Sequence, residues 1–266
     1  MPVVVDTHLH LYPCYDRVKL LQSLIRGLRS VAPGAQAAAC LVDGAGSAGY
    51  RNLTKATAGD CDGVSVRTLP NGDAAIVRCG DLGRVVIVAG RQIVTREKIE
   101  ILALGTRQTF ANGLDAAQTV EDILTQGALP VVSWAPGKWF FKRGRVVSSL
   151  LERFRPDQLL IGDTHLRPTV WPRPRLMKRA ARMGFRTVCG SDPLPIIGEE
   201  TRAGAYATAF TGKLDEEDPT ASFKRLLLLC EPYCTVGRRD TIVSVVRRLK
   251  RHAGRRRERS GDPERG

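Results

Sequence analysis

Runs of apolar residues alternate with amphipathic stretches over most of the chain. The short apolar runs predict strands, and stretches with apolar residues three or four positions apart predict helices. Repeated strand–helix units predict a parallel sheet, either closed as a barrel or open with helices on both faces. The predicted strands cover residues 3–8, 37–42, 98–105, 128–134, 157–163 and 185–192. The predicted helices cover residues 17–31, 114–126, 145–154 and 173–183, and further helices are expected in most of the chain after residue 192.

Between residues 60 and 96 the pattern changes to a period of two. The segment 63–80, GVSVRTLPNGDAAIVRCG, alternates apolar and polar residues on both sides of Asn71-Gly72, a pair typical of hairpin turns. The following GRVVIVAGRQIV extends this antiparallel part. We therefore expect residues 60–96 to be a β element inserted into a single barrel domain of residues 1–246.

The composition suits a globular protein. The chain of 266 residues is 43% hydrophobic, enough for one large domain with a buried core. No apolar stretch approaches the length of a membrane span, and the N-terminus lacks the pattern of a signal peptide. Seven cysteines form no dense framework, so we expect reduced thiols and a cytoplasmic location. The spacing in CEPYC, residues 230–234, does not match a CxxC pair for zinc or redox chemistry.

The formal net charge of +14 raises the question of nucleic-acid binding. Much of the excess lies in residues 247–266, RRLKRHAGRRRERSGDPERG, and no aromatic platform accompanies that segment. We therefore expect 247–266 to be the solvated end of a last helix followed by a disordered tail. Nucleic acid is a possible partner that these features do not favour.

Polar residues follow the ends of several predicted strands. In parallel α/β barrels the loops after the strands converge on one rim, so side chains far apart in the sequence meet there. The candidates for this rim are Asp6, His8, His10, Glu100, Lys138, Asp163, His165, Arg167 and Asp192.

His8 and His10 point to the same side of an extended strand, because side chains alternate with a period of two. Both imidazoles can therefore ligate one ion at roughly 2.0–2.1 Å. Carboxylates of Glu100 and Asp192 would complete the site, and Glu100 inside IEILAL is hard to explain as an unpaired core residue. Nitrogen and oxygen ligands suit zinc, manganese or iron, and a bound ion with an open position predicts hydrolytic chemistry. The alternative is a short motif that holds no ion.

Four further residues are candidates for proton transfer and substrate binding. Asp163 or His165 is a candidate for a further ligand or a general acid, and the alternative for His165 is a turn histidine that faces water. Lys138 and Arg167 are candidates for binding an anionic group of the substrate. The alternative for Arg167 is a structural ion pair.

An N-terminal DTHLHLY, a glutamate in IEILALG and a late GSD resemble the PHP (polymerase and histidinol phosphatase) family. The opening HxH also resembles the amidohydrolase and TatD-like deoxyribonuclease groups. The resemblance implies a distorted seven-stranded β/α barrel that hydrolyses phosphoesters with manganese, iron or zinc. It implies His8, His10, Glu100 and Asp192 as metal ligands and Asp6 as the residue that orients one of the histidines.

The chain departs from the PHP pattern at several points. No histidine occurs between His10 and His165, the segment where a third-motif histidine is expected reads SWAPG, and PLP follows Ser191-Asp192. We therefore expect one or two divalent ions rather than three.

The expected function is a metal-dependent hydrolase, a phosphoesterase acting on a small anionic substrate. Asp6, Asp163 and His165 are the expected catalytic residues, and Lys138 and Arg167 the substrate-binding ones. The first alternative is amidohydrolase or lactonase chemistry at the same site, with Lys138 carboxylated. The others are a catalytically degenerate barrel that binds a metabolite or partner, and nucleic-acid processing. The sequence leaves the oligomeric state open.

Overall fold

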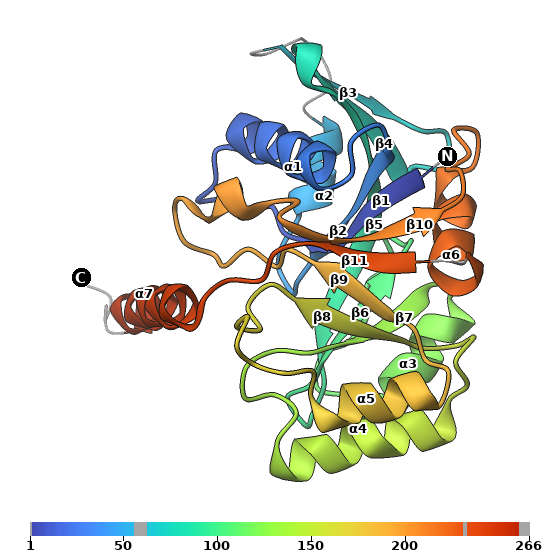
Figure 1. Cartoon of the computed structure of the whole chain (residues 1–266), viewed down its shortest axis with the longest axis vertical. Helices are drawn as coiled ribbons and strands as arrows, with labels where there is room; N and C mark the ends of the chain where they lie inside the picture. Colours follow the sequence, from blue (N-terminus) through green and yellow to red (C-terminus); the bar gives the residue numbers. More distant parts are fainter. Residues whose placement is uncertain (1, 56–62, 231–232, 261–266) are drawn as a thin grey trace.

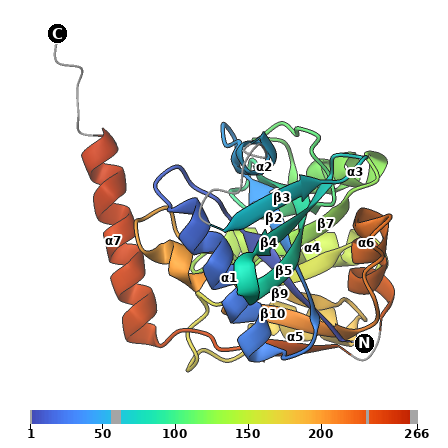
Figure 2. The same ribbon diagram turned by 90° about the horizontal axis from the view of Figure 1, so that it is seen from above.

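A barrel-like sheet forms the centre of the molecule, and helices lie around it (Figures 1 and 2). The computed structural model describes residues 2–55, 63–230 and 233–260, except for the side chains of 256–260. Nine strands follow one another in the order β11-β10-β1-β2-β5-β6-β7-β8-β9. These strands are β1 (Pro2–Leu9), β2 (Gln36–Asp43), β5 (Gly83–Val94), β6 (Glu100–Leu104), β7 (Leu129–Ser133), β8 (Leu160–Thr164), β9 (Thr187–Gly190), β10 (Tyr206–Thr211) and β11 (Tyr233–Gly237).

The sheet nearly closes because β9 returns to β1. The hydroxyl of Thr7 donates to the carbonyl of Cys189 at 3.0 Å, and the amide of Asp192 donates to the carbonyl of His8 at 2.8 Å. β1 also pairs antiparallel with β10, which in turn pairs with β11. The protein is therefore a mixed α/β fold with a nearly closed, barrel-like sheet.

Alternate residues of the strands fill the interior of the sheet or pack under the helices. Val3 and Val5 belong to the interior cluster, whereas Val4 between them packs in the cluster of α1. The helices are α1 (Arg17–Val31), α2 (Gly49–Lys55), α3 (Ala116–Thr125), α4 (Phe141–Arg153), α5 (Arg175–Arg182), α6 (Pro219–Leu229) and α7 (Ile242–Ser260), with two short 3-10 turns, η1 (Gly80–Leu82) and η2 (Glu199–Arg202).

The alternation of strands and helices confirms most of the pattern predicted from sequence. The helix predicted at 17–31 is α1 with the same bounds, and its N-terminal residue follows Asp16, whose carboxylate caps the amide of Lys19. The hairpin around Asn71-Gly72 is formed by β3 (Val64–Thr68) and β4 (Ala74–Cys79), which pair antiparallel. α7 projects from one side of the molecule in both views (Figures 1 and 2).

The sheet differs from seven parallel repeats at β6. β6 pairs antiparallel with both β5 and β7, because residues 95–99 form a tight turn instead of a crossover helix. In that turn the amide of Thr95 donates to the carbonyl of Ile99 at 2.9 Å. A TIM-like barrel of parallel strands is therefore not what the chain forms.

Two other expectations change. β5, within the segment 60–96, pairs in parallel with β2 and lies in the main sheet. Of the described strands, only β3 and β4 stand outside the nine-strand path. After residue 192, the chain adds β10 and β11 where helices were expected, because short strands of alanine and threonine lack a long apolar run.

Parts of three other predictions cannot be compared with the structure. Residues 60–62 of the expected insertion, 231–232 of CEPYC and 261–266 of the expected tail lie outside the described residues. Through residue 260 the basic segment is helical, as part of α7, and Arg248 within it is buried rather than solvated. Of the described helices, none is long and apolar enough to cross a membrane.

The contact between β9 and β1 gives a first test of the fold. A Cβ atom at Gly190 would lie 2.4 Å from the Cβ and 2.5 Å from the amide nitrogen of His8. We expect Gly190→Ala to lower the free energy of unfolding by about 2–3 kcal/mol, because β9 must move away from β1. Gly254→Ala, in α7, is the control, since a Cβ there meets nothing within 4 Å apart from the backbone of its own helix. Urea unfolding of both variants is the measurement, and equal stability would contradict this packing.

Candidate metal centre

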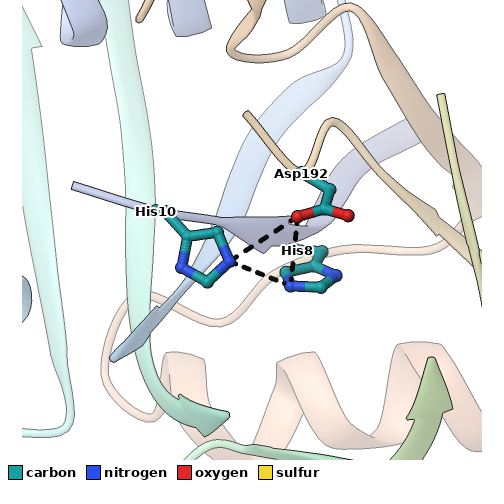
Figure 3. Close-up of side chains that lie close together, drawn as sticks. All are labelled: His8, His10 and Asp192. Carbon is teal, nitrogen blue, oxygen red and sulfur yellow. Dashed lines mark hydrogen bonds and ion pairs between the residues drawn. The ribbon is translucent and has the colours of Figure 1, made fainter. Parts of the chain in front are cut away.

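The end of β1 and the residues after β9 bring two histidines and one aspartate together. Figure 3 shows the rings of His8 and His10 and the carboxylate of Asp192 turned toward one another. The two Nε2 atoms lie 3.1 Å apart, and Asp192 Oδ1 lies 3.6 Å from the Nε2 of His8 and 3.7 Å from that of His10. In the part of the chain that the structure describes, this is the group of ligating side chains that could hold a metal ion.

The spacing of these three atoms fits a metal ion. Atoms at such separations can all lie about 2.0 Å from a common centre, within the range of zinc–nitrogen and zinc–oxygen distances of about 2.0–2.2 Å. One carboxylate and two imidazoles form a donor set that suits zinc, manganese or iron. The geometry therefore supports a divalent ion and leaves its identity open.

The orientation of the rings supports the same conclusion. Nδ1 of His10 donates to the carbonyl of Val42 at 2.8 Å, which leaves its Nε2 unprotonated in the neutral ring. Nδ1 of His8 lies 3.4 Å from the hydroxyl of Ser133 and, if it donates there, turns an unprotonated Nε2 toward His10. Burial and the neighbouring His8 lower the pKa of His10 to about 4, so this ring is neutral at neutral pH. Two unprotonated nitrogens this close repel each other unless a cation lies between them.

Asp192 is held in place by its backbone as well as by the histidines. Its φ of 44° lies in the left-handed region, which a residue other than glycine adopts at a cost of about 1–3 kcal/mol. Burial works to raise the pKa of its carboxyl, but His8, His10 and His165 together lower it below the ordinary value. The carboxylate is therefore ionised and faces the two rings.

Asp6 binds the backbone around the site, and its carboxylate makes no hydrogen bond to an imidazole ring. Its buried carboxylate accepts hydrogen bonds from the amides of His8 (3.1 Å), Ser191 (2.9 Å) and Gly204 (3.1 Å) and from the hydroxyl of Ser191 (2.5 Å). Burial raises the pKa of Asp6 in spite of these donors. Asp6 thus ties the backbone of His8 to that of Ser191, beside Asp192.

Glu100 lies at the same rim because β6 runs antiparallel to its neighbours. It is the first residue of β6 and pairs with Ser133, the last residue of β7. Its carboxylate lies 3.1 Å from the ammonium of Lys138 and is not one of the three converging ligands. The structure thus brings Glu100 and Lys138 together as an ion pair, 18% and 28% exposed, beside the cluster.

Tyr12 is a residue that the sequence reasoning missed. Its ring stacks on that of His10, with centroids 5.0 Å apart. Burial raises the pKa of Tyr12, and the charges of Asp192 and Glu100 raise it further, so the hydroxyl stays protonated close to both carboxylates. The period of two that selects His8 and His10 also selects Tyr12, and following it two residues further would have found this side chain.

Asp163 and Arg167 form a buried ion pair with each other. Arg167 Nε donates to Asp163 Oδ1 at 2.8 Å and Nη2 to Oδ2 at 2.5 Å, while Nη1 donates to the carbonyl of Trp171. The hydroxyl of Tyr206 donates to the same carboxylate at 2.9 Å. Since Arg167 is only 5% exposed, this is the structural ion pair named as its alternative role, and we assign neither residue to the reaction.

His165 is buried and faces protein on both sides of its ring. Nδ1 donates to the carbonyl of Ser191, and Nε2 accepts from Nη1 of Arg248 at 2.6 Å. Neither nitrogen is therefore available to a substrate, and the alternative of a turn histidine that faces water is wrong because the residue is 1% exposed. His165 instead holds the carbonyl that precedes Asp192, and Arg248 is a second residue that the sequence reasoning did not place near the site.

A cavity of about 800 Å³ opens beside His10 and Tyr12. Polar side chains of Arg17, Asn52 and Asn112 line it, together with the loop 44–49 after β2. The candidate site formed by His8, His10 and Asp192 thus has room for a small molecule next to one of its side chains.

Comparisons with known proteins support the fold and give no family. No family model matches the chain, and no curated protein matches its sequence. PsfC from Pseudomonas syringae PB-5123 is similar over 97% of this chain and 98% of its own, with a TM-score of 0.60 and 14% identity. The lesion-specific endonuclease PfuEndoQ from Pyrococcus furiosus shares 13% identity over 88% of this chain and 58% of its own, with a TM-score of 0.48. At 14% identity, the similarity to PsfC shows a shared fold alone.

Proposed function

We propose that this protein is a metal-dependent hydrolase that cleaves phosphoesters. The observation that carries this proposal is the pair of histidine nitrogens 3.1 Å apart, with the Asp192 carboxylate completing the triangle. His8, His10 and Asp192 would hold one divalent ion. When bound, such an ion supplies a Lewis acid that polarises a phosphoryl oxygen and acidifies water at neutral pH.

The chain's own residues would position an anionic substrate around that ion. Lys138, held by Glu100 and partly exposed, can bind a phosphate oxygen as a point charge. The protonated hydroxyl of Tyr12 can donate a hydrogen bond to the leaving-group oxygen. A second ion would have to replace Lys138 as the partner of Glu100, so the arrangement favours one ion over two. Lys138, and Arg17 in the cavity beside His10, favour phosphoesters over neutral amides or lactones.

Metal removal and replacement test this proposal. The protein is stripped with a chelator, dialysed, and assayed with p-nitrophenyl phosphate and bis-p-nitrophenyl phosphate after addition of zinc, manganese or iron. We expect no hydrolysis by the stripped protein, and recovery that saturates at about one ion per chain. A neutral p-nitrophenyl ester and a lactone are the controls. Hydrolysis of the neutral substrates alone would favour the amidohydrolase alternative, and no hydrolysis by fully loaded protein would refute the proposal.

A further inference from the structure

All three tryptophans of the chain line one hollow, which we call the aromatic cleft. The cleft has a volume of about 510 Å³ and lies between the loop after β7 and the segment that leads into α5. Its aromatic walls are Trp134, Trp139, Phe140 and Trp171. The ring of Trp171 lies 6.1 Å from that of Trp134 and 6.2 Å from that of Phe140, measured between centroids.

The aromatic surface continues out of the cleft into solvent. Trp171 is 36% exposed, Phe140 43% and Phe141 92%. Phe141 also has a φ of 54°, a left-handed conformation that costs a residue other than glycine about 1–3 kcal/mol. Exposed aromatic rings gathered on one face are typical of a surface that binds a ligand.

Three cations beside these rings have no acidic partner in the described part of the chain. The segments 134–151 and 164–191 contain no aspartate or glutamate and carry four and seven lysine or arginine residues, of which Lys138, Arg167 and Arg179 pair with carboxylates outside these segments. Arg173, Arg175 and Lys178 line the cleft itself. Within the described residues, none of these three side chains forms an ion pair or hydrogen bond. Their charges are therefore available to an anionic ligand.

The cleft adjoins the metal cluster through Ser133. The hydroxyl of Ser133 lies 3.4 Å from Nδ1 of His8, and its carbonyl accepts a hydrogen bond from Nε1 of Trp139 at 3.1 Å. Trp134, the next residue, forms the buried wall of the cleft at 1% exposure. The wall of the cleft and the ring of His8 thus both contact Ser133.

We propose that the aromatic cleft binds single-stranded nucleic acid, which deepens the proposed function by naming its substrate class. A base would stack against Trp171, and phosphates would contact Arg173, Arg175 and Lys178. Aromatic rings combined with unpaired cations are the features that bind such strands, since every base offers a flat face and every linkage a negative charge. The aromatic surface extends beyond the hollow to Phe141, which suits a strand of several nucleotides. In a duplex the faces of the bases are stacked on one another, so none is free to stack on Trp171.

Two binding measurements test this inference: quenching of tryptophan fluorescence, and the fluorescence anisotropy of a labelled oligonucleotide. Both are made in EDTA, so that binding is measured without a metal ion. We expect a ten-nucleotide oligothymidylate to quench the emission, because all the tryptophans line the cleft, and to bind more tightly than a duplex. With a labelled oligonucleotide, Trp171→Ala is expected to weaken binding about tenfold or more through the loss of one stacked base. An abasic oligomer of the same length should bind the parent and Trp171→Ala equally, since it has no base to stack.

A pair of charge-matched variants distinguishes the cleft from general electrostatic attraction. Arg173→Ser/Arg175→Ser removes two cations from the cleft, and Arg247→Ser/Lys250→Ser removes two from the exposed face of α7. We expect the cleft variant to lower the dependence of log affinity on log salt by about 1.4, at about 0.7 for each phosphate contact on a single strand. The α7 variant should change it much less. An equal change of the salt dependence in the two variants would overturn the inference. So would an affinity of the parent for the abasic oligomer equal to its affinity for oligothymidylate.

Failure of this inference can be told apart from failure of the proposed function. His8→Ala/His10→Ala is expected to bind the oligonucleotide as the parent does, because the cleft contacts do not use these rings. If Trp171-dependent binding persists while phosphoesters are never cleaved, the cleft stands and the hydrolase does not. If small phosphoesters are cleaved but Trp171→Ala binds oligothymidylate as the parent does, the hydrolase stands and the cleft proposal is wrong.

Discussion

The double substitution His8→Ala/His10→Ala is expected to remove both metal binding and hydrolysis. Two of the three converging ligand atoms disappear, and Asp192 alone cannot hold a divalent ion at micromolar concentration. We expect the metal content, measured by plasma mass spectrometry, to fall from about one ion per chain to none. Hydrolysis should fall about a thousandfold or more, since a bound ion contributes several kcal/mol to transition-state stabilisation.

His252→Ala is the matched control for this experiment. It removes a histidine of α7 that is not one of the three converging ligands, and is expected to leave metal content and hydrolysis unchanged. Circular dichroism of the double variant checks that the fold persists. Retention of a stoichiometric ion by the double variant would show that the cluster is not the metal site. A parent protein that takes up no ion when zinc, manganese and iron are offered would favour the degenerate barrel.

Periodicity alone could predict the parts of the structure in which side-chain direction follows from local conformation. The bounds of α1 and the shared orientation of His8 and His10 are both of this kind. Asp192 could also be predicted near them, because strand ends of a barrel-like sheet converge on one rim.

Strand direction and long-range pairing could not be predicted in the same way. An apolar run such as β6 is compatible with either direction, and only the tight turn at 95–99 makes it antiparallel. Likewise, the sequence does not show which oppositely charged residue forms an ion pair with a given side chain, or whether that pair lies at the rim or in the core. Asp163 and Arg167 pair with each other, and Glu100 pairs with Lys138, and the sequence did not indicate the partner of any of these four residues.

Arg248 shows most clearly how a charged segment can mislead. The density of lysine and arginine around it predicts a solvated helix, yet Val245, Arg248 and Leu249 form one face of α7 at spacings of three and four residues. That face packs on the protein, while Val243 and Val246 lie in solvent at 63% and 44% exposure. Within a basic helix, the period of the buried face is more informative than its net charge.

The largest loss of stability is expected from Arg248→Met, which keeps the length of the side chain but removes the guanidinium. Arg248 is 4% exposed, and its Nε lies 2.8 and 3.0 Å from the two carboxylate oxygens of Glu199. Its Nη1 lies 2.8 Å from Asp240 Oδ2 and 2.6 Å from Nε2 of His165. The substitution would leave Glu199 buried without its partner, which costs about 3–5 kcal/mol. Urea unfolding should show this loss.

The same change should also weaken metal binding, because Arg248 fixes His165 and His165 holds the carbonyl of Ser191 beside Asp192. Arg247→Met, on the exposed side of the same helix, is the control and is expected to change stability by less than about 0.5 kcal/mol. Adding Glu199→Gln to Arg248→Met should recover part of the lost stability, since it removes the unpaired charge. If the Arg248→Met and Arg247→Met variants have the same free energy of unfolding, the ion pair of Arg248 with Glu199 does not hold α7 against the protein. If stability falls while metal affinity stays that of the parent, Arg248 anchors the helix without positioning Asp192.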